Sequence, residues 1–406
     1  MSDRRRATQF EDLPEEIIVD QILIRLLSKD VGRYRAVNTS WHHATSTPQF
    51  MLEHRRRQPL LPIIDGQRKP SSYAVYTGAG ASGQQLWPFL PGSKTRYNAL
   101  FASCDGLLIV NYGPRLYICN PVIRRHALLP LLVYGQGFVN IVIGFYRHHP
   151  TKDYRVLLVS QNYPKYSLHN LTVGSDESRH IKVTMPAVSL PSVEQKLLNR
   201  LTDLRHCPPP VQHRGNLHWC PYGARDITEG GGDIIVFDTE AESFRWVRSP
   251  GQLCYNRKLF DMKGTLAFWG GSAPDFITIN VWVMQDYEAE IWAFKCRIDL
   301  STVDSSRRLY TTSLKKKRKK KTPLDSTVTL FNDMVVLNDR ELLIKFNGKH
   351  VLRCDIDGKF LGIVNLGTCQ YQISLTQHRF QESIVPIPYH GMQEEDEESP
   401  FYTGHV

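Results

Sequence analysis

The chain has 406 residues, 41% of them hydrophobic and 22% charged, a composition typical of a globular protein of two or three domains. The formal net charge of +10 suggests a nucleic-acid ligand, yet residues Lys315 to Lys321 carry +7 of it, which leaves +3 for the remaining chain. No apolar run reaches the roughly 20 residues of a bilayer span, and no signal peptide begins the chain. The eight scattered cysteines exclude a disulfide scaffold. We therefore expect an intracellular protein that does not contact membranes.

The polar residues 1–9 predict a disordered N-terminus, and the pattern of residues 10–54 predicts helices. Leu13-Pro14-Glu15-Glu16 starts the first helix, because a proline in the first turn loses no hydrogen bond and acidic side chains suit the helix dipole. The apolar residues that follow recur about every 3.6 residues. They form one stripe, which consists of Ile17, Ile18, Ile22, Leu23, Leu26 and Leu27.

Two further short helices are predicted in the same region. Asp30 is the expected cap of the second helix, and Ser40 is the expected cap of a third, which Pro48 ends. The apolar residues on these two helices are Val31, Tyr34, Val37, Trp41 and Ala44. Three short helices in about 40 residues make a poor independent core. We therefore expect a partner to cover part of their apolar surface.

The rest of the chain is predicted to be β-rich. Residues 55–98 predict a linker with some extended structure, because Pro, Gly and Ser cluster there. From residue 99 to residue 385, short β-branched and apolar runs alternate with turn signals. These runs are 106–112, 115–119, 141–145, 154–159, 233–237, 244–247, 278–283 and 341–346. Only the stretch around Val193 to Leu204 suggests a helix between them, so an antiparallel all-β domain is favoured over βαβ units.

A weak repeat in the β region indicates its architecture. A Gly-x-Leu strand start occurs at Gly106, Gly215 and Gly264, and the last two are 49 residues apart, within the range of one propeller blade. Polar turns between strands occur at residues 120–125, 237–240 and 355–360. We interpret the pattern as an irregular β-propeller of undetermined blade number, with a large β-sandwich as the alternative. The fold class is thus α+β, with N-terminal helices followed by an antiparallel β domain.

The N-terminal segment from Leu13 to Phe50 resembles an F-box. Besides the Leu13-Pro14 pair and the apolar stripe, the matching residues are Lys29-Asp30-Val31, Tyr34-Arg35-Ala36-Val37, Ser40-Trp41 and Pro48-x-Phe50. The sequence departs from the family pattern at Leu27, where many members have proline, and at Ala36 and Asn38, where cysteine is frequent. These changes leave the apolar face intact.

The β region is similar to the F-box-associated domain of large plant F-box families. Its hallmarks are Asn120-Pro121-x-x-Arg124-Arg125 with Leu129-Pro130, Gly144-Phe145 before Pro150-Thr151-x-Asp153-Tyr154-Arg155-Val156, Gly215-Asn-Leu-His-Trp219, and Val281-Trp282-Val283-Met284. The order of these motifs carries more weight than any one of them. The resemblance covers roughly residues 10 to 300 and fades beyond.

The resemblance implies a substrate-recognition subunit of an SCF-type ubiquitin ligase, with no catalytic role. The F-box would dock on a Skp-type adaptor, which bridges to a cullin and a RING protein, and the β domain would bind the protein to be ubiquitinated. The adaptor contacts that it implies are Leu13, Pro14, Ile17, Ile18, Ile22, Leu23, Leu26, Val31, Val37 and Trp41. The residues that would bind the substrate are not identified by the sequence.

Other chemistry that the motifs suggest is weakly supported. Gly78 to Gly83 match the G-x-G-x-x-G dinucleotide fingerprint, but Pro88 and Pro91 oppose the helix that this motif requires, so a flexible loop is expected. The pairs His42-His43 and His148-His149 lack the spacing and the partners of metal ligands. We expect no catalytic residue, no metal and no cofactor.

The basic run lies in an expected exposed loop, residues 313–324, inserted in the β domain. It consists of Lys315, Lys316, Lys317, Arg318, Lys319, Lys320 and Lys321. It is a candidate nuclear-localisation signal, a solvated loop, or a site for nucleic acid or acidic substrates. The expected location is accordingly the nucleus, the cytoplasm or both. Residues 386–406, with Glu394 to Glu398, predict an acidic disordered tail.

Two other functions remain open at this point. The basic run and a pI near 9.1 are compatible with a basic nuclear nucleic-acid-binding protein, although nucleic acid is disfavoured by the balanced charge of the remaining chain. A propeller enzyme or a carbohydrate-binding module is the third possibility.

Overall fold

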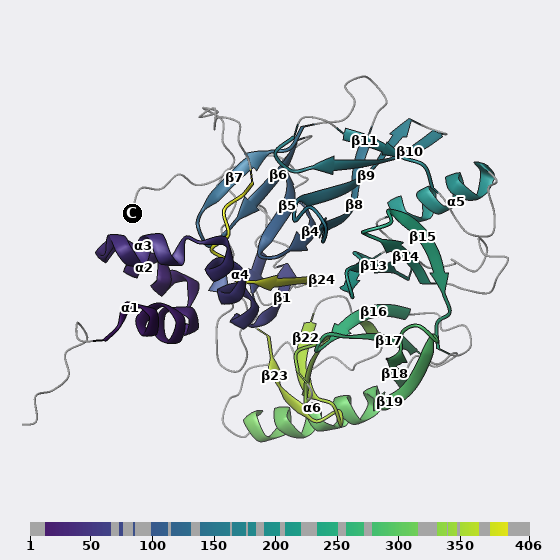
Figure 1. The fold of residues 1–406 in the computed structure, drawn as a ribbon. Coiled ribbons are helices and arrows are strands. Elements are labelled where there is room, and N and C mark those ends of the chain that lie inside the picture. Colours follow the sequence, from purple (N-terminus) through teal and green to yellow (C-terminus); the bar gives the residue numbers. More distant parts are fainter. Residues whose placement is uncertain are drawn as a thin grey trace, which may run out of the picture.

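The computed structural model shows a β-propeller with a group of short helices protruding from one side (Figure 1). It describes residues 13–65, 73–75, 84–85, 99–112, 115–130, 139–162, 165–175, 178–183, 191–203, 208–220, 234–250, 257–271, 278–315, 331–338, 340–346, 350–364 and 374–388. Within them, the strands form six four-stranded antiparallel sheets. The predicted propeller is confirmed, and the β-sandwich alternative is wrong.

The six sheets are numbered here as blades 1 to 6 around the ring, each from its innermost strand outward. Blade 1 consists of β24 (Ser374–Gln381), β1 (Leu60–Asp65), β2 (Tyr73–Val75) and β3 (Gln84–Gln85). Blade 2 consists of β4 (Leu100–Cys104), β5 (Leu107–Tyr112), β6 (Arg115–Asn120) and β7 (Arg125–Leu128). Blade 3 consists of β8 (Val139–Arg147), β9 (Tyr154–Asn162), β10 (Lys165–Thr172) and β11 (Ser178–Ile181).

The second half of the ring repeats this arrangement. Blade 4 consists of β12 (Val211–His213), β13 (Asn216–Trp219), β14 (Ile234–Asp238) and β15 (Ser243–Val247). Blade 5 consists of β16 (Arg257–Met262), β17 (Thr265–Gly271), β18 (Thr278–Asp286) and β19 (Ile291–Asp299). Blade 6 consists of β20 (Phe331–Val336), β21 (Glu341–Phe346), β22 (His350–Asp355) and β23 (Phe360–Ile363).

Blade 1 closes the ring by pairing the two ends of the chain. Strand β24 runs antiparallel to β1, with Leu60 opposite Gln381 and Asp65 opposite Ser374. The segment 55–98, expected as a linker with some extended structure, contributes β1, β2 and β3 to the propeller, so these three strands are extended but belong to a blade and not to a linker. Strand β1 was not recognised because it does not alternate apolar and polar residues as a half-exposed strand does, since Ile63 and Ile64 are both buried.

The Gly-x-Leu repeat marks the same turn in three blades. In each, a residue pair with positive φ joins the innermost strand to the second: Asp105-Gly106 (54° and 83°), Arg214-Gly215 (49° and 76°) and Lys263-Gly264 (54° and 77°). Positive φ at both central positions is typical of the hairpin turn whose twist matches antiparallel strands, and glycine adopts it without strain. The sequence signal thus identified real blade starts.

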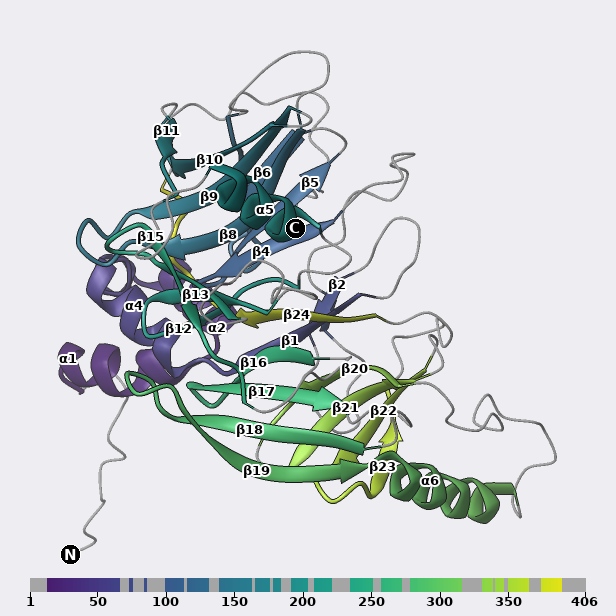
Figure 2. The same ribbon diagram turned by 90° about the vertical axis from the view of Figure 1, so that its right-hand side faces the viewer.

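Strand alternation places these turns, and the turns between third and fourth strands, on one face of the ring, which we call the turn face. The described parts of the connections between blades lie on the opposite face. They include two helices, α5 (Pro191–Thr202), which was expected nearby, and α6 (Leu300–Lys315), which was not. Figure 2 shows the N-terminal helices on the turn-face side, away from α6. No described helix is long and apolar enough to cross a membrane.

The N-terminal helices differ in detail from the prediction. They are α1 (Glu15–Ile17), a π-helical turn (Ile18–Ile22), a 3₁₀ turn (Leu23–Arg25), α2 (Ser28–Val37), α3 (Thr39–Thr45) and α4 (Pro48–Arg57). Helix α2 begins at Ser28, so Asp30 lies in its first turn and does not cap it. Asn38 caps α3 by accepting hydrogen bonds from the backbone of Ser40 and Trp41, so the expected Ser40 cap is wrong.

Pro48 starts a helix that the sequence did not predict. It lies at the beginning of α4, where Thr47 caps the helix by accepting a hydrogen bond from the Phe50 amide. A proline at this position is pre-organised for a helix, so it can end one helix and open the next. We call residues 13–58, which include all of these helices, the helical unit.

Candidate functional site

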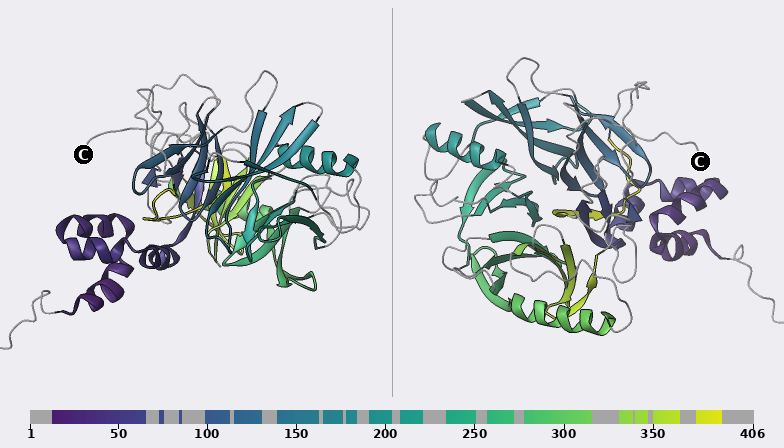
Figure 3. Two further views of the ribbon diagram at one scale, coloured as in Figure 1. Left: turned by 45° about the horizontal axis from the view of Figure 1, so that its top comes forward. Right: turned by 180° about the vertical axis from the view of Figure 1, so that it is seen from behind.

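The helical unit exposes apolar side chains that its own chain does not cover. Ile17 is 44% exposed, Leu27 60% and Val37 77%, and Tyr34, on the same helix as Val37, is exposed as well. Tyr34 packs edge-on against the half-buried Trp41, with 5.9 Å between ring centroids. Figure 3 shows most of the unit protruding from the side of the ring. This surface is therefore accessible to a partner.

The structure divides the ten expected adaptor contacts into three groups. Ile18, Leu23 and Val31 are buried in the core of the helical unit, where Phe50 of the unexpected α4 joins them. The exposed ones are Pro14, Ile17 and Val37. The half-buried ones are Leu13, Ile22, Leu26 and Trp41. The last two groups are open to a partner in this conformation, whereas the buried three stabilise the unit itself.

The chain following β24 fastens the helical unit to the propeller. Ile384 is buried in the same apolar cluster as Ile18 and Leu23, and Val122 of blade 2 packs against that cluster. Asn120 donates from its amide to the carbonyl oxygens of Ser383 (3.0 Å) and Val385 (2.8 Å). The Asn-Pro hallmark of the sequence thus has a defined role, because its asparagine holds residues 383–385 between blade 2 and the helices.

Polar contacts from α4 reinforce this junction. Arg55 forms an ion pair with Asp105 of the β4–β5 turn, and the Tyr154 hydroxyl donates to the other carboxylate oxygen at 3.0 Å. Gln381 donates from its amide to the carbonyl oxygen of Gln58 at 2.8 Å. The orientation of the helical unit relative to the turn face is therefore fixed by both apolar and charged contacts.

A cavity of about 280 Å³ lies in the central channel beside this junction. Its charged lining consists of Arg55, Asp105, Asp261 and Arg379, which sum to zero net charge. Burial lowers the pKa of Arg379 to about 10, and Arg379 donates to the Val336 carbonyl oxygen at 2.5 Å. Burial raises the pKa of the Cys104 thiol, which favours the unreactive protonated form at neutral pH.

Two buried histidines make the stability of the propeller depend on pH. Burial lowers the pKa of His378, which lines the channel, to about 4, and that of His218 to about 3. His218 is held neutral by donating from Nδ1 to Val211 (3.2 Å) and accepting at Nε2 from the Tyr287 hydroxyl (2.7 Å). Both pKa values lie below the value of about 6.5 in the unfolded chain. The contribution of the two neutral histidines to the free energy of unfolding is therefore complete above that pH and is lost on acidification.

We expect acidification from pH 7 to pH 5 to lower the free energy of unfolding by about 2 kcal/mol for each of these two histidines. Urea unfolding followed by circular dichroism at the two pH values measures it. A His378→Gln variant, although less stable at pH 7, should lose about 2 kcal/mol less than the wild type over the same interval. An equal loss in both proteins would contradict this assignment.

The seam between blades carries a repeated acidic turn that the sequence reasoning missed. Asp238-Thr-Glu-Ala-Glu242 in blade 4 and Asp286-Tyr-Glu-Ala-Glu290 in blade 5 join the third strand to the fourth. In each turn, the aspartate Oδ1 accepts hydrogen bonds of 2.9–3.0 Å from the backbone amides of the first glutamate and of the alanine that follows it. The signal that could have revealed it is the Asp-x-Glu-Ala-Glu match 48 residues apart.

Both glutamates of each turn reach back to the preceding blade. Glu240 lies 3.3 Å from His149, and Glu288 lies 3.7 Å from Arg214. Glu290 accepts from the backbone amide of Arg248 at 3.1 Å and lies 3.6 Å from its guanidinium. The two turns therefore connect neighbouring blades, blade 3 to blade 4 and blade 4 to blade 5, through polar contacts.

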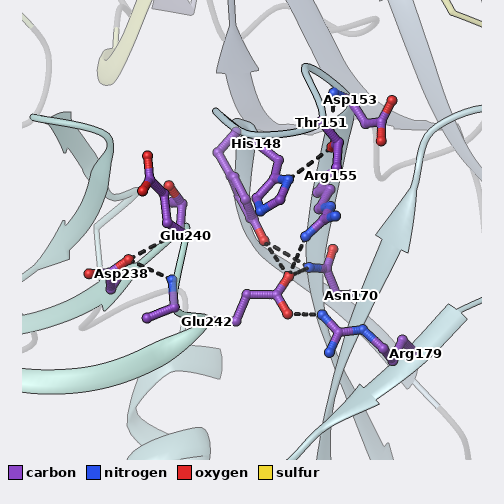
Figure 4. Close-up of polar contacts among 12 residues, drawn as sticks. His148, Thr151, Asp153, Arg155, Asn170, Arg179, Asp238, Glu240 and Glu242 are labelled. Atoms are coloured by element: carbon purple, nitrogen blue, oxygen red, sulfur yellow. Dashed lines mark hydrogen bonds and ion pairs between the residues drawn. The ribbon is translucent and has the colours of Figure 1, made fainter.

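Glu242 is less exposed than Glu290, and Figure 4 shows its contacts with Arg155, Asn170 and Arg179. Its carboxylate accepts from Arg155 at 2.7 Å and forms an ion pair with Arg179, and the side chains of Arg155 and Glu242 are only 15% and 10% exposed. The buried Asn170 donates both to Glu242 and, at 2.8 Å, to the Tyr146 hydroxyl. Register places these groups on one face of blade 3, since Arg155 lies opposite Thr172 and Asn170 opposite Arg179.

Beside Glu242 lies a second cavity of about 380 Å³, which we call the seam pocket. It is lined by Arg155, Asn170, Thr172, Ser175, Ser178 and Arg179. His148 lies near it but is held by the Thr151 hydroxyl at 2.8 Å, and burial lowers its pKa. The pocket wall is therefore built of guanidinium, hydroxyl and amide groups.

Several sequence motifs have no counterpart in these sites. Among the described residues, no group of three or more His, Cys, Asp and Glu side chains could hold a metal ion. The Gly78–Gly83 loop and the acidic tail from 389 on lie outside the described residues. Lys315 ends α6, and the rest of the basic run lies outside them too, so its role in nuclear import stays a prediction.

Comparisons with known proteins agree with this architecture. A family model described as "F-box associated beta propeller domain" matches residues 89–317. Similar proteins of Arabidopsis thaliana include two F-box proteins, 25% and 24% identical, and an F-box/kelch-repeat protein, 23% identical. The alignments cover 69%, 68% and 70% of this chain, and 62%, 70% and 78% of those proteins.

Solved structures show weaker likeness. YCF48 from Cyanidioschyzon merolae has a TM-score of 0.39 at 10% identity, over 80% of this chain and 94% of that chain. AztD from Citrobacter koseri has a TM-score of 0.34 at 9% identity, over 77% and 96%. Both TM-scores are too low to transfer any property to this chain.

Proposed function

The chain belongs to the F-box associated beta propeller domain family, and we propose from this that it is the substrate-recognition subunit of an SCF-type ubiquitin ligase. In this proposal the helical unit is an F-box that docks on a Skp-type adaptor, and the propeller binds the protein to be ubiquitinated. The family match and the relatives named F-box proteins support the proposal. The cullin and the RING protein would be reached through the adaptor.

The observation that carries the proposal is the uncovered apolar surface of the helical unit. Fully burying a Val, Leu or Ile side chain contributes about 1.5–3 kcal/mol, so Ile17, Leu27 and Val37 together offer a substantial gain to a partner with a complementary groove. Part of this gain is offset by the loss of freedom on association. Helices α1 and α2, which carry Ile17 and Val37, protrude from the side of the ring, so an adaptor could cover them without blocking the propeller (Figure 1).

The proposed role requires positioning and no chemistry in this chain. A receptor that holds its substrate near a ubiquitin-charged enzyme raises the effective concentration of the two reactants. The contacts of Asn120, Arg55 and Ile384 support such a role, because they fix the helical unit on the propeller. A rigid junction keeps the substrate at a constant distance from the adaptor.

A double substitution, Ile17→Asp with Val37→Asp, is expected to weaken adaptor binding at least 100-fold, because two charges would be buried at the interface. Both side chains are exposed in the free protein, so the fold should be retained. The measurement is co-purification with a Skp-type adaptor, followed by titration calorimetry. Leu13→Ala with Pro14→Ala, which alters the motif pair, should also reduce binding.

Leu309→Asp is the matched control, since Leu309 is an exposed leucine on α6, far from the helical unit. This variant should bind the adaptor as the wild type does. The proposal fails if folded wild-type protein does not retain the adaptor, or if the Ile17/Val37 double variant retains it equally well. Circular dichroism of every variant separates loss of binding from loss of folding.

A further inference from the structure

The cavity in the central channel, which we call the channel cavity, is lined by two pairs of opposite charges, and only one pair is closed. Arg55 forms an ion pair with Asp105, which also accepts a hydrogen bond from the Tyr154 hydroxyl. Arg379 and Asp261 line the same cavity. Burial lowers the pKa of Arg379, and the nearby Asp261 carboxylate opposes this shift. No ion pair joins these two side chains, however, in the part of the chain that the structure describes.

Both members of the open pair can still bind a ligand. The Arg379 guanidinium has five N–H groups, and one of them donates to the Val336 carbonyl oxygen at 2.5 Å. The Asp261 carboxylate accepts from the Gly264 amide at 3.0 and 3.3 Å, which leaves lone pairs on both oxygens. Both side chains are half-buried, and hydrogen bonds to charged groups are stronger there than at the open surface.

The fold itself does not require a carboxylate at position 261. Asp261 lies two residues before the positive-φ pair Lys263-Gly264, and the equivalent positions hold Ser103 in blade 2 and Gln212 in blade 4. Both of these residues are neutral, and both line the channel cavity. Because two blades form the same turn without this charge, a ligand is its simplest explanation.

The neighbouring titratable groups leave the two open charges available. His378 also lines the cavity, but burial lowers its pKa to about 4, so it is neutral at neutral pH. Burial also lowers the pKa of His213, which lies near Asp261, so this histidine is neutral too. Lys258 pairs with Asp333 at 2.5 Å, and neither of them lines the cavity. The channel cavity therefore presents one cation and one anion to a ligand.

We propose that the channel cavity binds a free α-amino acid with an apolar side chain. The carboxylate of the ligand pairs with Arg379 and its ammonium group with Asp261, because both contacts are charge-assisted hydrogen bonds and guanidinium groups match carboxylates in shape. Recognition of both groups on one carbon requires that neither is blocked by a peptide bond, which is true only of a free amino acid.

The rest of the cavity suits the side chain and the size of such a ligand. Its apolar lining residues are Leu60, Ala102, Phe145, Leu217, Phe260 and Val335. The volume of about 280 Å³ far exceeds the roughly 10–15 Å³ that one water needs, and it lies just below the range of pockets for drug-sized ligands. The lining comes from α4 and from all six blades, so the ligand is enclosed by the ring.

This inference goes beyond the receptor role and does not rest on it. The two charged contacts lie on β16 and β24, which line the central channel (Figure 1). The surface proposed for the adaptor is formed by the exposed apolar residues of the helical unit, and none of these lines the cavity. Each site can therefore be tested without disturbing the other.

The first measurement is thermal unfolding of the purified full-length chain with valine, leucine, isoleucine, methionine or phenylalanine, each at about 10 mM. At least one of them should raise the unfolding temperature. Calorimetric titration then compares the tightest of them with two analogues of similar shape, one lacking the ammonium group and one lacking the carboxylate. For leucine these are isocaproate and isoamylamine. Each analogue is expected to bind at least about tenfold more weakly than the amino acid.

Asp261→Asn removes the anionic contact but keeps an oxygen that accepts from the Gly264 amide, so the turn should be retained. This variant should bind the amino acid about tenfold more weakly and bind the analogue without an ammonium group nearly as the wild type does. A purely structural role of Asp261 would weaken both equally. Asp286→Asn is the matched control, because Asp286 also accepts from backbone amides in a turn of blade 5 but does not line the cavity. The control should bind the amino acid as the wild type does.

The inference is overturned if none of the five amino acids stabilises the wild type, or if Asp261→Asn binds the tightest of them unchanged. Equal binding of the analogue that keeps the carboxylate would show that the ammonium group is not recognised, and would reject the amino acid as the ligand. Wild type that retains the adaptor but binds no amino acid refutes the channel-cavity inference alone. Wild type that binds an amino acid without retaining the adaptor refutes the receptor role alone.

Discussion

Replacing Glu242 by alanine is expected to lower the free energy of unfolding by about 3 kcal/mol, because it leaves the largely buried Arg155 without its counter-charge. The change also removes the acceptor for Asn170 and the ion pair with Arg179. Blades 3 and 4 would then be joined at this end mainly by their apolar contacts. Urea unfolding monitored by tryptophan fluorescence measures the loss.

Glu290→Ala is the matched control for this prediction. Glu290 occupies the equivalent position of the next turn, but its partner Arg248 is well exposed. Ion pairs in solvent contribute about 0–1 kcal/mol, so this variant should lose no more than that. Equal losses in the two variants would show that enclosure by Arg155 and Asn170 does not distinguish Glu242.

The second large effect is expected at Gly106, which lies where the helical unit, the chain after β24 and blade 2 meet. A Cβ atom at this position would lie 2.4 Å from the Cβ of Ser383 and 2.6 Å from the carbonyl oxygen of Gln381. Gln381 ends β24 and Ser383 follows it in the chain, so neither can move aside without disturbing the strand that closes the ring. The φ of +83° adds roughly 1–2 kcal/mol for any residue with a Cβ.

We therefore expect Gly106→Ala to lower the free energy of unfolding by about 2–4 kcal/mol, from backbone strain and overpacking together. Gly264→Ala controls for the backbone contribution, because Gly264 has nearly the same φ, +77°, in the equivalent turn of blade 5, with nothing within 4 Å of the added Cβ. The control should lose only about 1 kcal/mol. Thermal and urea unfolding of both variants measure the two losses in the free energy of unfolding. Similar losses in the two variants would refute the steric argument.

The Gly106 substitution should also loosen the helical unit. Ser383 is held by Asn120, and Ile384 is buried among the helices, so a displaced Ser383 would pull this contact apart. Limited proteolysis should then cut Gly106→Ala between the helical unit and the propeller faster than Gly264→Ala. This comparison distinguishes local loosening from general instability.

The sequence reasoning predicted much of the fold and less of the sites. The helix start at Pro14 and the glycine turns were found because their signals are local: a first-turn proline and a positive-φ residue act on their own backbone. The two helix details that were wrong, at Asp30 and Ser40, concern caps, for which several nearby residues compete. Helix α4 after Pro48 was missed. The contacts of Glu242 were missed because Arg155 and Arg179 belong to blade 3, whereas Glu242 belongs to blade 4.

By itself, the sequence determined the order of the elements: short N-terminal helices, then strands separated by turns in a repeating pattern. These follow from hydrophobic periodicity and turn chemistry within a few residues. Only the tertiary structure decided that β1 pairs with β24, that α4 covers Ile18 and Leu23, and that Glu242 meets Arg155 and Arg179. Each of these contacts joins residues far apart in the chain, so its energy exists only once the ring has closed.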